Sequence, residues 1–123
     1  GRVPRSEVIA ALRKSDFTVL MRDPEKQFAQ AGMPTKVTES LGCGTPVIAN
    51  ITSDLAEHLK DGVDSIVVDE YSVEACASAF RRAAALSSSA RLVMRREACT
   101  AMQNGLDYRG YAVAIDTFLL GDK

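Results

Sequence analysis

The sequence predicts an α/β fold in which a parallel sheet is flanked by helices. Three short apolar runs, at 17–21, 46–50 and 65–69, have the continuous apolar character of strands buried on both faces of a parallel sheet. Segments with helical spacing or helix caps separate these runs and follow the last one. Strands that alternate with helices in this way are typical of α/β proteins.

The composition excludes several classes of protein. The 123 residues suit one domain, and a net charge of -1 without any tryptophan argues against a nucleic-acid partner. The apolar runs are far too short to cross a bilayer. Three widely spaced cysteines and one histidine predict neither a disulfide framework nor a metal site. We therefore expect reduced thiols as small core side chains, and His58 on a solvated surface.

The first half of the chain predicts a helix, a strand and a loop. Residues 6–16 repeat apolar side chains at helical spacing, and Ser6 is the expected N-cap. The strand at 17–21 follows. Residues 22–32 are expected to form a polar loop, and long ordered loops are often functional.

Residues 53–62 predict a capped helix. Asp54 stands three residues before Glu57, as in a capping box, and Gly62 lies just past the expected end.

The second half is mainly helical. We expect a helix that begins at Ser72 and buries one apolar stripe, made of Val73, Cys76, Ala77, Phe80, Ala83 and Ala84. A further helix is expected to begin at Ser88 or Ser89 and to end near Gly105. The final helix, at 111–120, is so apolar that we expect it to dock on another surface.

Only three strands are visible, whereas a doubly wound mononucleotide-binding domain normally has more. The order of elements therefore predicts a Rossmann-like parallel sheet that lacks its first strands.

The stretch Gly32–Asn50, "GMPTKVTESLGCGTPVIAN", carries the chemistry. Pro34 suits the first position of a helix, and Met33 before it has no oxygen that could cap the helix. The amides of Thr35, Lys36 and Val37 are therefore expected to lack an acceptor. Together with the helix dipole and the Lys36 ammonium, they predict a phosphate site.

Glu39 lies five residues beyond Pro34, roughly 7.5 Å along the helix axis. A phosphate would repel a carboxylate so close to it, so we expect the carboxylate to accept hydrogen bonds from neutral hydroxyls. The diol of a ribose, one sugar ring away from the phosphate, would supply them. The spacing predicts a nucleoside diphosphate. The alternative is a solvent-exposed ion pair between Lys36 and Glu39, with "GCGTP" serving only as a turn into the strand.

This stretch, followed by "LAEHLKDGVDSIVVD", resembles the nucleotide-sugar-binding half of the C-terminal domain of GT-B glycosyltransferases. The resemblance is closest to the large retaining family known as glycosyl transferases group 1, or family 4. It covers residues 1–87, because "GRVPRSEVIAALRKSDFTVLMR" fits the upstream segment of that family. From residue 88 onward the chain resembles only a helical tail.

The resemblance implies roles for individual residues. Glu39 matches the glutamate that binds the donor ribose, and the loop ahead of the helix, Ala31 to Thr35, matches the segment around the distal phosphate and sugar. This loop includes Gly32, Met33 and Pro34. Ala31 replaces a second glutamate of the usual pattern, so Lys36 or Arg22 would meet the phosphates or the sugar instead.

Arg22 has an alternative role, because it could pair with Asp23 or Glu25 in its own loop. Gln30 is a further candidate for a sugar contact. Arg2 and Val3 match the segment that lines the base pocket in the resembling family.

The resemblance implies a partial donor-binding domain over 1–123, with 88–123 as its helical tail. The full enzyme would transfer a sugar from a UDP or GDP type donor to a glycan or lipid-linked acceptor, in polysaccharide, capsule or lipopolysaccharide biosynthesis. It would need no metal or other cofactor, and an N-terminal domain of the same protein would bind the acceptor. We expect it in the cytoplasm or at the inner face of the membrane, and the fragment alone to be inactive. The alternatives are a GT-B sugar-nucleotide epimerase and a non-catalytic α/β interaction module.

Overall fold

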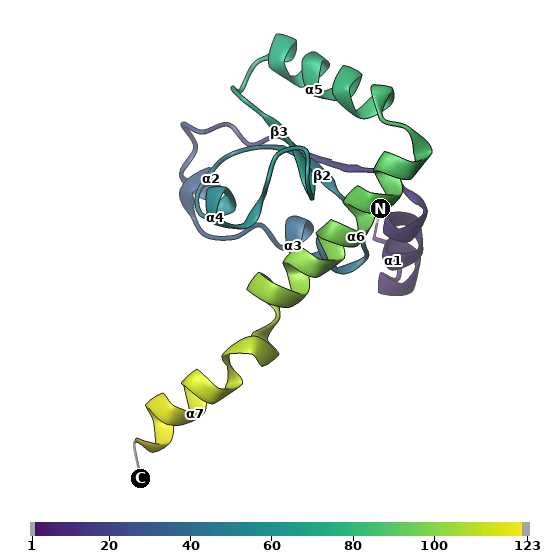
Figure 1. Cartoon of the computed structure of the whole chain (residues 1–123). Helices are drawn as coiled ribbons and strands as arrows, with labels where there is room; N and C mark the ends of the chain where they lie inside the picture. The colour runs from purple at the N-terminus through teal and green to yellow at the C-terminus, as the bar shows by residue number, and fades with distance from the viewer. Residues whose placement is uncertain (1, 122–123) are drawn as a thin grey trace.

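The computed structural model describes residues 2–121 and confirms the predicted α/β class (Figure 1). Its sheet has the strand order β1-β2-β3, formed by β1 (Thr18–Leu20), β2 (Val47–Asn50) and β3 (Ser65–Val68). All neighbouring strands are parallel. The central strand β2 is buried along its whole length, as predicted for its continuous apolar sequence.

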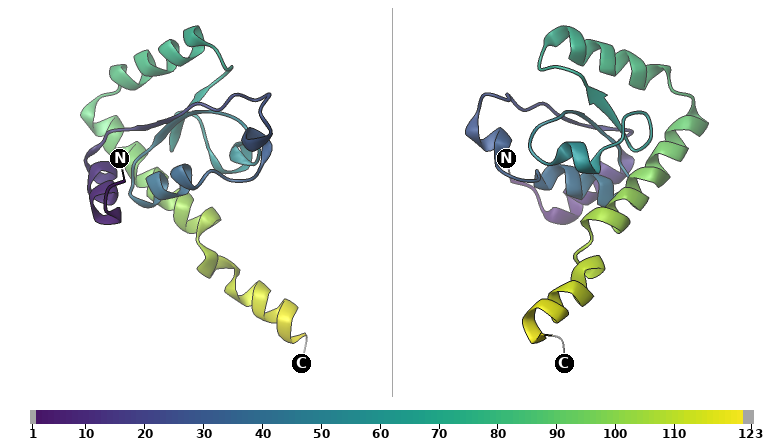
Figure 2. Two further views of the ribbon diagram at one scale, coloured as in Figure 1. Left: turned by 180° about the vertical axis from the view of Figure 1, so that it is seen from behind. Right: turned by 60° about the vertical axis from the view of Figure 1, so that its left-hand side comes forward.

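Helices cover both faces of the sheet, as Figure 2 shows from two further directions. On one face, α3 (Thr35–Gly42) and the single turn α4 (Leu55–His58) pack against Val47 and Ala49 of β2. Their core also receives a side chain from α6 (Ser88–Ala101), which crosses beside α3.

The opposite face is covered by α5 (Val73–Ala85), which contacts β3. Here Ile48 of β2 points toward α5, because successive side chains of a strand alternate between the two faces. Met94 of α6 joins this second core cluster, so α6 closes one end of both layers.

The first helix, α1 (Arg5–Lys14), has its N-cap two residues earlier than predicted. Pro4 is its N-cap, and the amide of Glu7 donates to the Pro4 carbonyl at 3.0 Å. Ser6 therefore lies inside the helix, and the prediction that it caps α1 was wrong. The fixed φ of proline, here −56°, allows the chain to enter the helix without a side-chain cap.

The C-terminal end of α1 is held by an arginine from far along the chain. Arg95 of α6 donates to the carbonyl oxygens of Ser15, at 2.6 Å, and Arg13, at 2.9 Å. Basic side chains commonly satisfy the last carbonyls of a helix in this way. This contact fixes α1 against α6, although α1 buries no residue completely.

Strand β1 is less buried than predicted, since the side chain of Val19 is 49% exposed. The reason is that β1 is an edge strand in the described residues, so its surroundings are open on one side. The loop that follows contains a single helical turn, α2 (Gln27–Gln30), which the sequence did not indicate. Ala29 is fully buried and anchors this turn.

The helix predicted over 53–62 is only the one turn of α4. Asp54 occupies the N-cap position but its side chain makes no capping bond. Gly62 has a φ of +74° and belongs to the turn into β3, where its amide donates to the Ser65 carbonyl at 2.8 Å. Asp64 supports the same turn by accepting the amide of Lys60 at 2.8 Å. The second half of the predicted helix is therefore a strand entry.

Helix α5 begins as predicted, because the Ser72 hydroxyl accepts the amide of Ala75 at 3.1 Å. Its buried side is narrower than the predicted stripe and consists of Ala79 and Ala83. Val73, Phe80 and Ala84 are exposed, while Cys76 and Ala77 are half-buried. Small residues face the sheet because they let the helix approach it closely, and the larger apolar residues lie to one side.

Helix α6 is capped by Ser87, one residue before the predicted start, through a 3.2 Å bond from the Ala90 amide. It continues into one π-helical turn, η1 (Met102–Leu106), close to the predicted end. His58 is half-buried rather than solvated, and a Cβ at Gly105 of η1 would lie 3.7 Å from its Nδ1. The three cysteines are free and half-buried.

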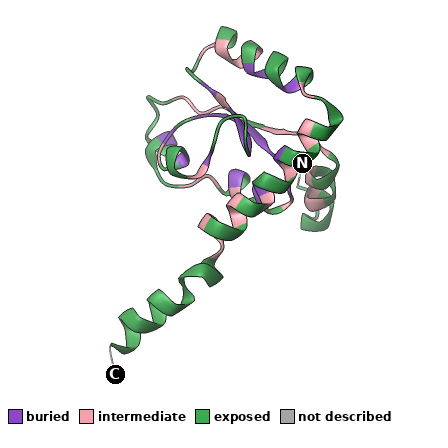
Figure 3. Ribbon diagram, in the orientation of Figure 1, coloured by how far each residue is buried: buried purple, intermediate pink, exposed green. Residues whose placement is uncertain are grey.

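The chain ends with a short 3-10 turn, η2 (Tyr108–Tyr111), and α7 (Ala112–Leu120). All nine residues of α7 are exposed, and the helix extends away from the sheet and its covering helices (Figures 1 and 3). The prediction that it docks is therefore wrong for the described residues. None of the helices in residues 2–121 is long and apolar enough to cross a membrane.

Candidate functional site

The start of α3 is uncapped, as predicted, but it lies one residue later. Pro34 is the N-cap, with an extended ψ of 122°, and the first helical residue is Thr35. The amide of Val37 donates to the Pro34 carbonyl at 2.9 Å, so the prediction that it lacks an acceptor was wrong. Among the described residues, the amides of Thr35 and Lys36 have no hydrogen-bond acceptor. Two amides are therefore available to a ligand.

The loop before α3 reaches this start through a left-handed residue. Gly32 has a φ of +69° with open space around its Cα, which is a conformation that favours glycine. Met33 packs its side chain on the core beside α3, so it contributes backbone only. The side chain of Gln30 donates to the Pro24 carbonyl at 2.9 Å, which holds it within the loop. Ala31 is exposed.

Lys36 and Glu39 line the same cavity, of about 350 Å³, between α1, β1 and α3. Its remaining wall is largely apolar and is formed by Val8, Leu12, Thr18, Val19, Leu20, Val37 and Val47. No ion pair joins Lys36 to Glu39 in the part of the chain that the structure describes. The alternative of a simple surface pair is therefore not what the structure contains.

Glu39 also lines a second cavity, of about 370 Å³. Arg5 and Arg13 of α1 line that cavity. Glu39 thus lines two cavities, and an ionised carboxylate can only accept hydrogen bonds. It is suited to hydroxyl or amide donors, whereas the amides at the helix start are suited to an anion.

Arg22 follows β1 at the carboxyl edge of the sheet, where ligands bind in open parallel sheets. Its guanidinium lies 5.6 Å from the centre of the Phe28 ring. It pairs with neither Asp23 nor Glu25, so this alternative is absent from the described residues. Its Nη1 is buried and has no hydrogen-bond partner among residues 2–121. A partly buried cation without a counter-charge is costly, which favours an anionic ligand.

Two residues at this edge were missed by the sequence analysis. Asn50 ends β2, is 4% exposed, and binds the backbone of Arg22 through both ends of its carboxamide. Thr52 is also 4% exposed, and its hydroxyl has no partner in the described part of the chain. An amide residue at the end of an otherwise apolar strand, "PVIAN", is the only signal that could have pointed to Asn50. The Ser65 hydroxyl also has no partner among residues 2–121, but Ser65 begins β3 at the amino end of the strands.

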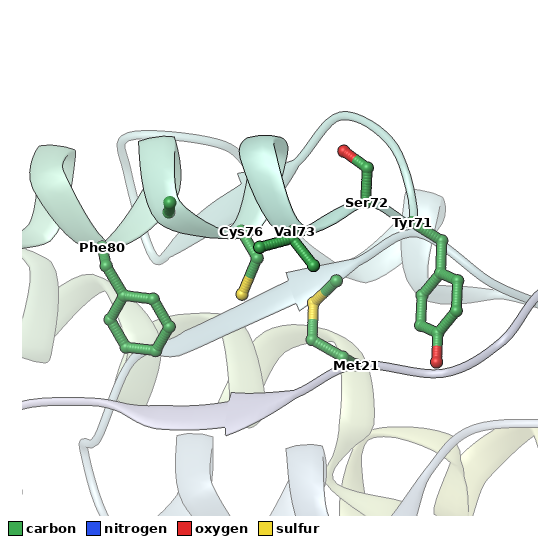
Figure 4. Close-up of a pocket in the computed structure, with 7 residues that line it drawn as sticks. Met21, Tyr71, Ser72, Val73, Cys76 and Phe80 are labelled. Carbon is green, nitrogen blue, oxygen red and sulfur yellow. The ribbon is translucent and has the colours of Figure 1, made fainter.

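A larger cavity, of about 550 Å³, has none of these residues in its lining. In Figure 4, Val73 and Cys76 of α5 point toward Met21, while Phe80 lies at one end of the cavity and Tyr71 at the other. No charged side chain lines it, so its chemistry is apolar and differs from that of the α3 start. The segment Arg2–Val3, expected near a base pocket, is exposed.

The family model for glycosyl transferases group 1 matches residues 1–85. The chain belongs to this family. The matched range contains all three strands and the start of α3, while α6 and α7 lie beyond it. No curated protein matches the sequence. Membership in the group 1 glycosyltransferases indicates a glycosyltransferase-like function and makes a nucleotide-sugar donor the expected ligand.

Proposed function

We propose that this chain is the donor-binding part of a retaining GT-B glycosyltransferase. The full-length enzyme would transfer a sugar from a UDP or GDP type donor to a glycan or lipid-linked acceptor in polysaccharide, capsule or lipopolysaccharide biosynthesis. The observation that carries this proposal is that Lys36 and Glu39 line one cavity, while two amides at the start of the same helix have no acceptor among residues 2–121. A volume of about 350 Å³ falls within the usual range of ligand cavities, about 300–1,000 Å³.

Each group has a role that follows from its chemistry. The Glu39 carboxylate accepts hydrogen bonds from the two ribose hydroxyls of the donor. The amides of Thr35 and Lys36, with the Lys36 ammonium and the helix dipole, hold a phosphate. Gly32, Met33 and Pro34 form the backbone that borders the distal phosphate and the sugar.

Arg22 supplies a second fixed cation for the donor diphosphate. When the sugar is transferred, the departing diphosphate keeps the negative charge, and pre-positioned cations and amides stabilise it. In this proposal the protein's own groups carry that charge, so no cofactor is assigned. An acceptor-binding domain of the same protein would complete the site. The full-length enzyme would work in the cytoplasm or at the inner face of the membrane. We expect the present chain alone to transfer no sugar.

The proposal is tested by titrating the 123-residue chain with UDP, GDP and ADP while following backbone amides by NMR. We expect the shifts to cluster at Thr35, Lys36 and Glu39 for one base. The variant Glu39→Ala should weaken binding, whereas Glu74→Ala, an exposed glutamate in the first turn of α5, should not. A nucleotide that binds elsewhere, or equal affinity in Glu39→Ala, would refute the assignment.

A further inference from the structure

The side chain of Asn50 continues the strand pairing past the point where β1 ends. The last paired residues of β1 and β2 are Leu20 and Ala49. One position further along β2, the Asn50 Oδ1 accepts the backbone N–H of Arg22 at 2.8 Å. Its Nδ2 donates to the backbone carbonyl of the same arginine at 2.7 Å. A carboxamide here replaces a peptide group of the ladder.

Both hydrogen bonds require the amide chemistry of asparagine. A carboxylate accepts but cannot donate, and an aliphatic side chain does neither. Since Asn50 is 4% exposed, water cannot readily replace the lost partner. The backbone of Arg22 is thus held at two atoms by one buried side chain.

Holding the backbone also directs the side chain. The N–H and C=O of Arg22 flank its Cα, so fixing both restricts the direction in which its Cβ leaves the chain. The guanidinium then meets the Phe28 ring at 5.6 Å from the ring centre, as in a cation–π contact. A pre-ordered guanidinium loses less conformational freedom when an anion binds.

We propose that Asn50 is a positioning residue, which fixes the backbone of Arg22 so that the guanidinium meets the diphosphate of the donor. The inference rests on the proposed function, because it needs a nucleoside diphosphate in this site. It adds Asn50 to the residues that decide affinity, without a contact of its own to the ligand. It also assigns Arg22 to the diphosphate rather than to the ribose or the base.

A double-mutant cycle tests this assignment. The affinities of the nucleoside diphosphate that binds and of its matching nucleoside are measured for the wild type, Asn50→Ala, Arg22→Ala and the double variant. We expect Asn50→Ala to weaken the diphosphate about tenfold, as for one charge-assisted hydrogen bond, and to leave the nucleoside unchanged. In the Arg22→Ala background, Asn50→Ala should add no further loss. If Asn50 had only a general structural role, Asn50→Ala would weaken the binding of both ligands, and the loss would also appear in the Arg22→Ala background.

Two controls keep the result interpretable. Asn104→Ala changes an exposed asparagine of η1 and should leave both affinities unchanged. If Asn50→Ala does not fold, the Arg22 Nε–H resonance of the wild type tests whether the guanidinium meets the diphosphate. It should move on addition of the diphosphate and stay in place with the nucleoside.

The outcomes separate the two proposals. If none of UDP, GDP and ADP binds the wild type, the proposed function and the role of Asn50 fall together. If a nucleotide binds and Glu39→Ala weakens it, but Asn50→Ala does not, only the role of Asn50 falls. That role also falls if the Arg22 Nε–H signal stays in place with the diphosphate.

Discussion

Helices α1 and α3 begin with the same local chemistry but have different surroundings. Each has a proline at the N-cap, no side-chain cap, and an amide that donates back to the proline carbonyl, at 3.0 Å in α1 and 2.9 Å in α3. Only α3 buries residues completely, and it places Lys36 and Glu39 on the wall of a cavity that α1 lines with apolar side chains. An uncapped helix start is therefore not a site by itself, and the proposed site depends on the side chains within the next turn of α3 and on their neighbours.

The largest expected effect is on the free energy of unfolding, which should show that α3 is more firmly anchored than α1. Leu41 of α3 is fully buried, so Leu41→Ala should lower the free energy of unfolding by about 2–5 kcal/mol. Leu12 of α1 is half-buried, and Leu12→Ala should cost only about 1 kcal/mol. Urea denaturation followed by circular dichroism measures both. Equal losses would show that α1 is as firmly anchored as α3.

A negative charge introduced at the start of α3 should weaken nucleotide binding, whereas the same charge at the start of α1 should have little effect. In Pro34→Asp the new carboxylate would lie next to the bound phosphate and weaken the nucleotide at least about tenfold. Pro4→Asp places the same charge at the exposed start of α1 and should change affinity less than about twofold. Calorimetric titration with the nucleotide that binds provides the test. A similar loss in both variants would remove the phosphate from the start of α3.

The capped helices provide the next comparison. Ser72 and Ser87 each accept an amide of their helix, so replacing either with alanine should cost about 1 kcal/mol of folding stability. At Pro34 there is no side-chain cap to lose, and Pro34→Asp should be more stable than Pro34→Ala by a similar amount. Thermal unfolding of the four variants without ligand measures these differences. Greater stability of Pro34→Ala would show that the amides are already satisfied.

The smallest expected effect is a pH dependence at the exposed side of α5. Partial desolvation would raise the pKa of Asp61, but hydrogen bonds from Arg82 and the Val67 amide outweigh it and hold the pKa below 3.8. The folded protein therefore binds this proton less tightly than the unfolded chain. The contribution is present above the ordinary pKa and is lost as the pH falls below it.

Because both side chains of this pair are over 40% exposed, the loss should be at most about 0.5 kcal/mol. Unfolding measured between about pH 5 and pH 3 should show a shallower slope in Asp61→Asn. An unchanged slope would mean that the pair contributes nothing to folding. Asp61 should contribute no pH dependence to the start of α3.

Much of the fold follows from local sequence. The three strands appear where continuous apolar runs predict them, because such runs favour strands and are too short for a core helix. Ser72 caps α5 as predicted, since capping depends only on residues within one turn. The length of α4 could not be predicted, because Ser53 takes a φ of 52° and the residues after His58 form hydrogen bonds with the entry to β3 instead.

The candidate site divides in the same way. The spacing of Pro34, Lys36 and Glu39 placed an amide-rich helix start beside a carboxylate, and that arrangement is local to one helix. Asn50 was not predicted because its partner, Arg22, is 28 residues earlier in the chain. A contact of that kind depends on the register of two strands, which no short pattern of residues reports.

The sequence by itself therefore determined the alternation of strands and helices, the uncapped start of α3 and the two charged side chains within its first turns. These features depend on backbone propensity and on neighbours within a few residues. Only the tertiary structure decided that Lys36 and Glu39 line one cavity, how Arg22 is held, and that α7 stays exposed in the described chain. The physical reason is that burial and counter-charge are set by residues distant in sequence, which meet only when the sheet is assembled.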